Sequence, residues 1–164
     1  HERRKSMSRD AQFTHAHMTR FERLLPASRE KVWALLTTPA LLPGWYGKGR
    51  IEGYVGGRVD LMGGHIKGVV TQWVLQKRLA YTWNVFMPGQ MVSDYPESYL
   101  TVEIDNAKLT LTHLPVLEAF VKLNAMGWHT YLDMLEAAAR DEAVKPREAY
   151  MKRNAAIYGV EMPS

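Results

Sequence analysis

The sequence contains no cysteine among its 164 residues. This absence excludes disulfides, thiolate metal sites and cysteine nucleophiles, and it favours a reducing compartment. No apolar run approaches the roughly 20 residues that a membrane-spanning helix needs. The basic start HERRKSMSRD is not followed by the apolar segment of an export signal. We therefore expect a cytoplasmic protein without membrane insertion.

Excess positive charge is absent from the middle of the chain, although the formal net charge is +4. Residues 1–20 hold five basic and two acidic side chains, and residues 140–164 hold five and four. Residues 21–139 hold eleven of each. A duplex-binding domain normally carries a basic stripe on its folded body. The distribution therefore predicts no nucleic-acid partner.

The composition is that of a folded globular chain, with 46% hydrophobic and 23% charged residues. The length suits one domain with one core. We expect that domain at residues 19–142, preceded by a basic extension at 1–18. The remaining extension, 143–164, is compatible with a further helix that docks on the body or on a second subunit.

The first half of the domain predicts a strand, two helices and then a sheet. Residues 19–25 alternate as in a strand, and Ser28 stands where the N-cap of a helix over REKVWALL should be. Thr38 precedes a second short helix, PALL. Between Tyr46 and His113, closely spaced turn residues separate short β-branched and aromatic segments, which predicts an antiparallel sheet.

One face of that sheet is apolar and needs a cover. Apolar residues alternate in its last three segments, for example at Leu100, Val102 and Ile104. The segment 125–142 carries an apolar stripe at helical spacing and predicts an amphipathic helix of roughly five turns. We expect this helix to lie across the apolar face.

Particular segments carry a resemblance to a known family, in order along residues 19–142. They are VWALLTTPALLPGWYG, Gly56-Gly57-Arg58-Val59, the run GVVTQWVLQKRLAYTW from Gly68 to Trp83, LTLTH ending at His113, and Gly127-Trp128 followed by YLDML. Together they resemble the START-like (SRPBCC) superfamily, in the branch named for the heat-shock protein 90 ATPase activator homologues. Two segments depart from the pattern, namely the long Met-rich NVFMPGQMVSDYP and the tail after residue 142.

The resemblance implies an α+β helix-grip fold, in which a curved antiparallel sheet wraps around a long C-terminal helix. It also implies a cavity between sheet and helix, and usually neither a metal nor an organic cofactor. The superfamily includes carriers, receptors, cyclases and co-chaperones, so the fold alone does not decide the function.

The candidate ligand-binding residues are mostly aromatic or apolar side chains on the expected inner faces. They are Trp45, Tyr46, Tyr81, Trp83, Met87, His113, Trp128, Tyr131, Leu132 and Leu135. Apolar pockets with a few polar groups are the usual sites for small molecules. The alternative is that these rings only fill the core. Met87 and Met91 suit either a pocket lid or a loop packed on itself.

Two histidines need separate interpretation. His113 ends an apolar strand face, where it is either a structural histidine, which we favour, or an acid, base or hydrogen-bond partner for a ligand. We name no catalytic residue. His129 and Asp133 are four residues apart on the long helix, a spacing that suits a metal or an ion pair. We favour a solvated ion pair and expect no metal and no cofactor.

Three functions remain open at this point. The first is a binding module that holds a small apolar or amphipathic molecule, such as a lipid, gated by the loop at residues 84–96. The second is a cyclase- or hydrolase-type enzyme, which needs a second polar group beside His113. The third is a co-chaperone that activates a heat-shock protein 90-type ATPase. We favour the binding module, and a homodimer is left open.

Overall fold

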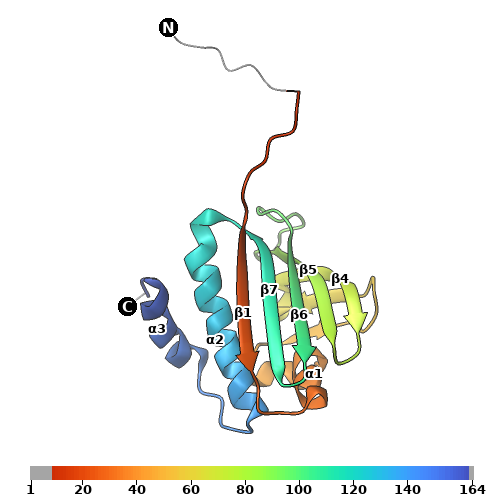
Figure 1. The fold of residues 1–164 in the computed structure, drawn as a ribbon, viewed down its shortest axis with the longest axis vertical. Coiled ribbons are helices and arrows are strands. Elements are labelled where there is room, and N and C mark those ends of the chain that lie inside the picture. The colour runs from red at the N-terminus through yellow and green to blue at the C-terminus, as the bar shows by residue number, and fades with distance from the viewer. Residues whose placement is uncertain (1–8, 163–164) are drawn as a thin grey trace.

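The sheet has seven antiparallel strands that curve around one long helix (Figure 1). The computed structural model describes residues 9–162, so residues 1–8 of the basic extension and residues 163–164 lie outside the described part. The strands follow the order β1-β7-β6-β5-β4-β3-β2. Their bounds are β1 (His17–Leu24), β2 (Gly49–Ile51), β3 (Arg58–Leu61), β4 (Ile66–Val74), β5 (Arg78–Val85), β6 (Ser98–Asp105) and β7 (Lys108–Val116).

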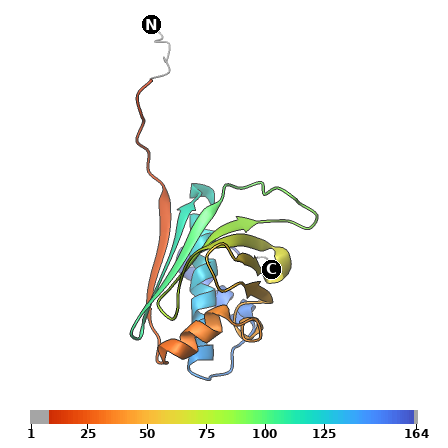
Figure 2. The ribbon, with the colours of Figure 1, turned by 90° about the vertical axis from the view of Figure 1, so that its right-hand side faces the viewer.

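Residues 9–162 also contain three α-helices and three 3-10 turns. They are α1 (Arg29–Thr37), α2 (Val121–Ala139), α3 (Arg147–Tyr158), η1 (Leu42–Gly44), η2 (Met62–Gly64) and η3 (Glu118–Phe120). Figure 2 shows α2 lying in the hollow of the curved sheet. This arrangement confirms the predicted α+β fold class, with an antiparallel sheet gripping a C-terminal helix.

After β1, the structure confirms the predicted N-cap of the first helix but not the predicted position of the second helix. Ser28 Oγ accepts a hydrogen bond from the backbone N–H of Lys31 at 3.1 Å, as an N-cap should. The predicted second helix at residues 39–42 is wrong, because helical structure resumes only at η1. Pro43 suits this first turn through its fixed φ, and Leu42, 2% exposed, anchors it in the core.

The inner face of the sheet is built by the predicted alternation. Leu100, Val102 and Ile104 of β6 are buried, and Leu100 lies opposite His113 of β7. The covering helix α2 begins at Val121 and ends at Ala139, instead of spanning 125–142. It ends early because Asp141 adopts a positive φ of 56°, which a helix cannot continue.

The last helix, α3, flanks α2 on the side that the sheet leaves open (Figures 1 and 2). Asp133 of α2 joins three elements there. It accepts hydrogen bonds from Arg23 of β1 at 2.9 Å and from Asn154 and Arg153 of α3 at 3.0 and 3.1 Å. Burial alone would raise the pKa of Asp133, but the hydrogen bonds from Asn154 and Arg23 and the neighbouring charges outweigh it, so this pKa lies below its usual value.

The interpretation of His129 and Asp133 as a solvated pair is therefore wrong. Their side chains are only 23% and 12% exposed, because α3 covers this face of α2. His129 Nδ1 lies 2.8 Å from the hydroxyl of Tyr158, and its Nε2 lies 3.9 Å from Asp133. The pair belongs to the junction between α2 and α3.

We expect Asp133→Ala to lower the free energy of unfolding by about 2 kcal/mol, because it leaves Arg23 and Asn154 without their acceptor. Urea unfolding measures this loss. Glu103→Ala is the matched control, since the Glu103 side chain is 50% exposed in its ion pair with Arg78. That variant should lose less than about 0.5 kcal/mol. Equal losses would contradict a special role of Asp133.

Candidate functional site

A pocket of about 450 Å³ lies between the sheet and the first half of α2. Its lining residues come from η2, β4, β5, β6, β7, η3 and α2, from the loop between β5 and β6, and from Tyr46 after η1. Figure 2 shows this loop projecting beyond the sheet. The aromatic lining residues are Tyr46, Trp83, Tyr95, Phe120, Trp128 and Tyr131. The volume lies within the range that small-molecule pockets usually have.

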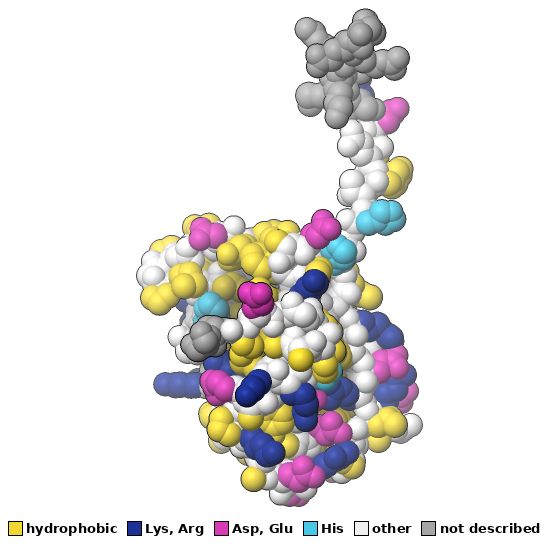
Figure 3. Space-filling view, turned by 90° about the vertical axis from the view of Figure 1, so that its left-hand side faces the viewer, with side chains coloured by type: hydrophobic (Ala, Val, Ile, Leu, Met, Phe, Trp, Pro, Cys, Tyr) yellow, Lys and Arg dark blue, Asp and Glu magenta, His cyan; other side chains and the backbone are white. Residues whose placement is uncertain are grey.

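The opening of the pocket is bordered by exposed apolar side chains. Leu117, Phe120 and Leu123 line the pocket and are still 42%, 37% and 48% exposed. Figure 3 shows hydrophobic side chains, with acidic ones among them, at the end of the body next to the N-terminal extension. Most of the basic side chains of that face lie farther from this end.

One corner of the pocket is polar and is organised around His113. Trp128 Nε1 donates to His113 Nδ1 at 3.0 Å, which makes Nδ1 an acceptor and places the imidazole hydrogen on Nε2. That Nε2 donates to Ser98 Oγ at 2.8 Å, and Ser98 Oγ donates to the backbone oxygen of Trp83 at 3.3 Å. Asn124 Nδ2 also donates to His113 Nδ1, at 3.1 Å.

These contacts leave His113 without the properties of a general base. Burial lowers the pKa of His113 from 6.5 to about 4, so the ring is neutral at neutral pH. A hydroxyl and an amide lie within hydrogen-bond reach, as an enzyme would require. However, Trp128 and Asn124 already occupy the lone pair of Nδ1. The geometry supports a structural role in which His113 orients the polar corner.

We expect the pKa of His113 to make stability depend on pH. The unfolded chain binds a proton at this site near pH 6.5, whereas the folded chain binds it only near pH 4. Protons therefore favour unfolding as pH falls from 6.5 toward 4, and the stability that is full above pH 6.5 is lost in that window. Between pH 7 and pH 5 the loss from this group should be about 2 kcal/mol.

Urea unfolding at both pH values tests this, with His113→Gln as the comparison. Wild type should lose about 2 kcal/mol more than His113→Gln over that range, since the remaining titrating groups are common to both. Identical pH dependence of the two proteins would contradict the depressed pKa. An NMR titration of the imidazole in wild type gives an independent value.

The structure brings half of the predicted ligand-binding residues to this pocket. Tyr46, Trp83, His113, Trp128 and Tyr131 line it. A second, deeper void of about 20 Å³ has Trp45, Tyr81, Leu132 and Leu135 in its wall. That volume holds about one water molecule, so these four side chains act as core.

Met87 is 55% exposed and does not line the pocket. The same loop contributes Tyr95 and Pro96 to the lining instead. Tyr95 packs edge-on against Phe120 with ring centroids 5.5 Å apart, and this contact joins the loop to η3 beside the opening.

Sequence reasoning missed the two polar partners of His113. Ser98 stands two residues before Leu100 and so continues the inward alternation of β6. Asn124 stands four residues before Trp128 and so lies next to it on α2. The sequence contains both spacings, but a search for hydrophobic residues does not detect polar residues that lie on an apolar face.

Gly127 lies in the middle of α2 and lines the pocket. Glycine in a helix interior costs about 1 kcal/mol relative to alanine. Close packing does not require it here, since a Cβ atom at Gly127 would have no neighbouring atom within 4 Å. The missing side chain therefore leaves space in the pocket.

The part of the chain that the structure describes supports neither a metal site nor a membrane-spanning helix. Residues 9–162 contain no group of three or more His, Asp or Glu side chains placed to hold a metal ion. Over the same residues, none of the helices combines the length and apolar character needed to cross a membrane.

The chain matches one family model and a set of solved structures. The family model, described as "Activator of Hsp90 ATPase homolog 1-like protein", matches residues 26–140. Among curated proteins, no match was found.

Several solved structures share this fold. The protein MLL2253 from Mesorhizobium loti is 24% identical with a TM-score of 0.64, over 76% of this chain and 97% of that chain. A Bordetella parapertussis protein encoded by BPP1335 is 20% identical with a TM-score of 0.68, over 94% and 91%. PFC0360w, described as an HSP90 activator from Plasmodium falciparum, is 20% identical with a TM-score of 0.59, over 75% and 94%.

Proposed function

The chain belongs to the family of activator of Hsp90 ATPase homolog 1-like proteins, and we propose that it binds a small apolar or amphipathic molecule in the pocket between its sheet and α2. The observation that carries this proposal is the pocket itself. Its volume of about 450 Å³ and its largely apolar lining, with several aromatic rings and one polar corner, are typical of ligand sites. The lack of cysteine also fits a cytoplasmic location.

The loop between β5 and β6 is suited to admit the ligand. Phe86 is bonded to His65 through its backbone N–H and oxygen. From Met87 onward the hydrogen bonds of the loop are mainly internal, for example from the backbone N–H of Met87 to Gln90 and from Gln90 to Asp94. The ring contact between Tyr95 and Phe120 joins it to the far side of the pocket. Segments held by few tertiary contacts open at low free-energy cost. We therefore assign the gate to residues 87–96, close to the 84–96 expected from the sequence.

Tryptophan fluorescence tests the proposal, because Trp83 and Trp128 line the pocket. Purified protein titrated with a panel of lipophilic molecules should show a saturable change in emission. Trp83→Phe should reduce that change. Trp73→Phe is the matched control, since Trp73 packs on Trp33 with ring centroids 5.0 Å apart and does not line the pocket. Absence of saturable binding across the panel, by fluorescence and by calorimetry, would overturn the proposal.

A second candidate is activation of a chaperone ATPase. It is favoured by the similarity to PFC0360w, which is described as an HSP90 activator. Such a role would use the surface of the domain instead of the pocket. The test adds the protein to an Hsp90-type chaperone and measures ATP turnover, and no stimulation at saturating protein would reject it. The enzyme hypothesis ranks below both, because the lone pair of His113 Nδ1 is occupied.

A further inference from the structure

The walls of the pocket carry no formal charge. Among residues 9–162, none of the side chains that line it is Asp, Glu, Lys or Arg. Its two histidines are His113, whose ring is neutral and fully engaged, and His65, exposed and bonded through Nδ1 to the backbone oxygen of Phe86 at 2.9 Å. An ion moved from water into such a site loses hydration without gaining a counter-charge.

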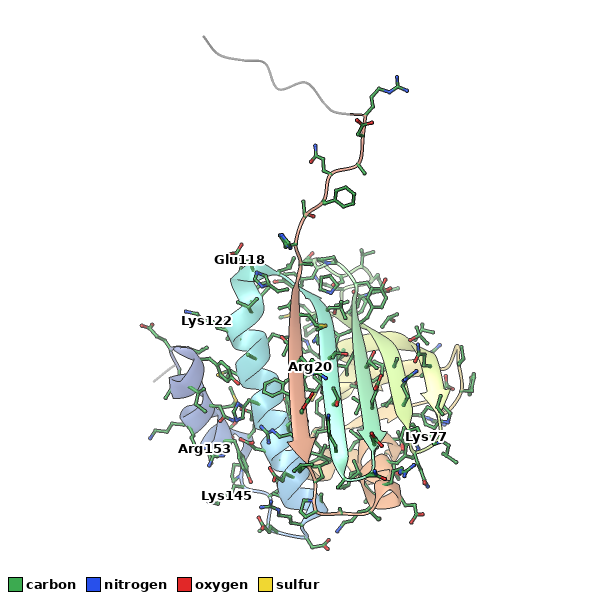
Figure 4. The ribbon with its side chains drawn as sticks, in the orientation of Figure 1. Arg20, Lys77, Glu118, Lys122, Lys145 and Arg153 are labelled. Carbon is green, nitrogen blue, oxygen red and sulfur yellow. The ribbon has the colours of Figure 1, made fainter. Side chains whose placement is uncertain are left out.

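Charged side chains near the pocket lie outside its lining. Glu118 and Lys122 are exposed on η3 and α2, outside the pocket lining, and Figure 4 shows them at the outer edge of this end of the molecule. Arg147 donates to the hydroxyl of Tyr131 at 3.0 Å but is itself exposed on α3. Lys67 lies over the ring of Phe86, which is not a lining residue. These charges do not supply a buried partner for an ionic ligand.

The polar corner has mainly acceptor capacity left. The N–H of His113 Nε2, the hydroxyl hydrogen of Ser98 and the indole N–H of Trp128 are all donated within the protein. Ser98 Oγ keeps one lone pair, and Asn124 Oδ1 is buried without a hydrogen-bond partner, whereas the donor left at this corner is the second N–H of Asn124 Nδ2. A carboxylate can use only that one N–H, whereas a ligand hydroxyl or N–H can donate to both acceptors.

We infer that the pocket selects uncharged molecules whose polar group donates a hydrogen bond, such as alcohols, phenols or neutral amides, and that it discriminates against carboxylates and ammonium ions. This inference rests on the proposed ligand-binding function. Aromatic rings attract cations, so ammonium ligands are the sharper comparison. Without a buried carboxylate in the lining, the loss of hydration outweighs that attraction.

Calorimetry with three matched probes tests the inference. The probes are 2-naphthylmethanol, 2-naphthoate and 2-naphthylmethylammonium, which share one ring system and differ in charge. At pH 8.0, where imidazoles are neutral, we expect the alcohol to bind at least about tenfold more tightly than either ion. Equal or tighter binding of an ion would overturn the inference and leave the proposed function standing. Absence of binding by all three, together with a silent lipophilic panel, would instead overturn the proposed function.

A charge introduced at the opening gives an independent test. Leu123→Lys places an ammonium group on a lining residue that is already 48% exposed. It should raise the ratio of the affinity for 2-naphthoate to the affinity for the alcohol at least about threefold. Leu75→Lys is the matched control, because Leu75 is 64% exposed and does not line the pocket. A gain in both variants, or in neither, would contradict a site limited by its missing counter-charge.

Discussion

Gly127→Phe should weaken ligand binding at least about 100-fold, equivalent to ~2.7 kcal/mol, while the protein stays folded. The new ring would grow from the middle of α2 into the space that the glycine leaves open. Two sets of atoms cannot share that volume, so the ligand would be excluded. Helix stability should not suffer, because phenylalanine is the better helix former by roughly 0.5 kcal/mol.

Gly127→Ala is the control for filling the pocket with a phenyl ring. It adds one methyl group and should raise the free energy of unfolding by about 1 kcal/mol, with the ligand still bound. Calorimetry and urea unfolding on the same three proteins separate occlusion from misfolding. Wild-type affinity in Gly127→Phe would place the ligand elsewhere on the molecule.

Gly68→Ala should lower the free energy of unfolding by at least about 3 kcal/mol. At this point β4 lies so close to β5 that a Cβ atom would overlap the backbone oxygen of Thr82 and come within 2.7 Å of its carbonyl carbon. Backbone atoms inside a sheet cannot move aside as a flexible side chain does. Relief would require β4 and β5 to separate, with loss of the bond from Val69 N–H to Thr82 Oγ1.

Gly44→Ala is the matched substitution for this test. A Cβ atom at Gly44 would meet no atom within 4 Å, and its φ is not positive. That variant should stay within about 0.5 kcal/mol of wild type. If Gly68→Ala were equally mild under urea unfolding, the close approach of the two strands would not be a feature of the protein in solution.

The sheet was predictable because its inner face follows a period of two. The alternation of Leu100, Val102 and Ile104 predicts that face even when the neighbouring strands are unknown.

The start of α2 was not predictable from the sequence, since the residues of its first turns face the pocket and not the core. Leu123, Asn124 and Gly127 form a second stripe beside the buried one. A pattern search tuned to a single apolar stripe therefore begins the helix too late.

The environment of His113 was out of reach of sequence reasoning for a different reason. Its hydrogen-bond partners come from β6 and from two places on α2, and only the folded chain brings them together. The inward direction of His113 followed from alternation, but its neutral state depends on burial and on the Trp128 donor. The burial of Asp133 under α3 could not be predicted either, because a charged residue on a helix is normally exposed to solvent.

Asp133 holds α2 to β1 and α3 through three hydrogen bonds, whereas residues 87–96 of the β5–β6 loop are hydrogen-bonded chiefly to one another. The helix wall of the pocket is thus anchored independently of the loop at its opening. Ligand preference and foldability should consequently be separable in this chain, since an exchange of residues 87–96 leaves the Asp133 junction in place. Laboratory redesign of the binding site should begin with that exchangeable segment.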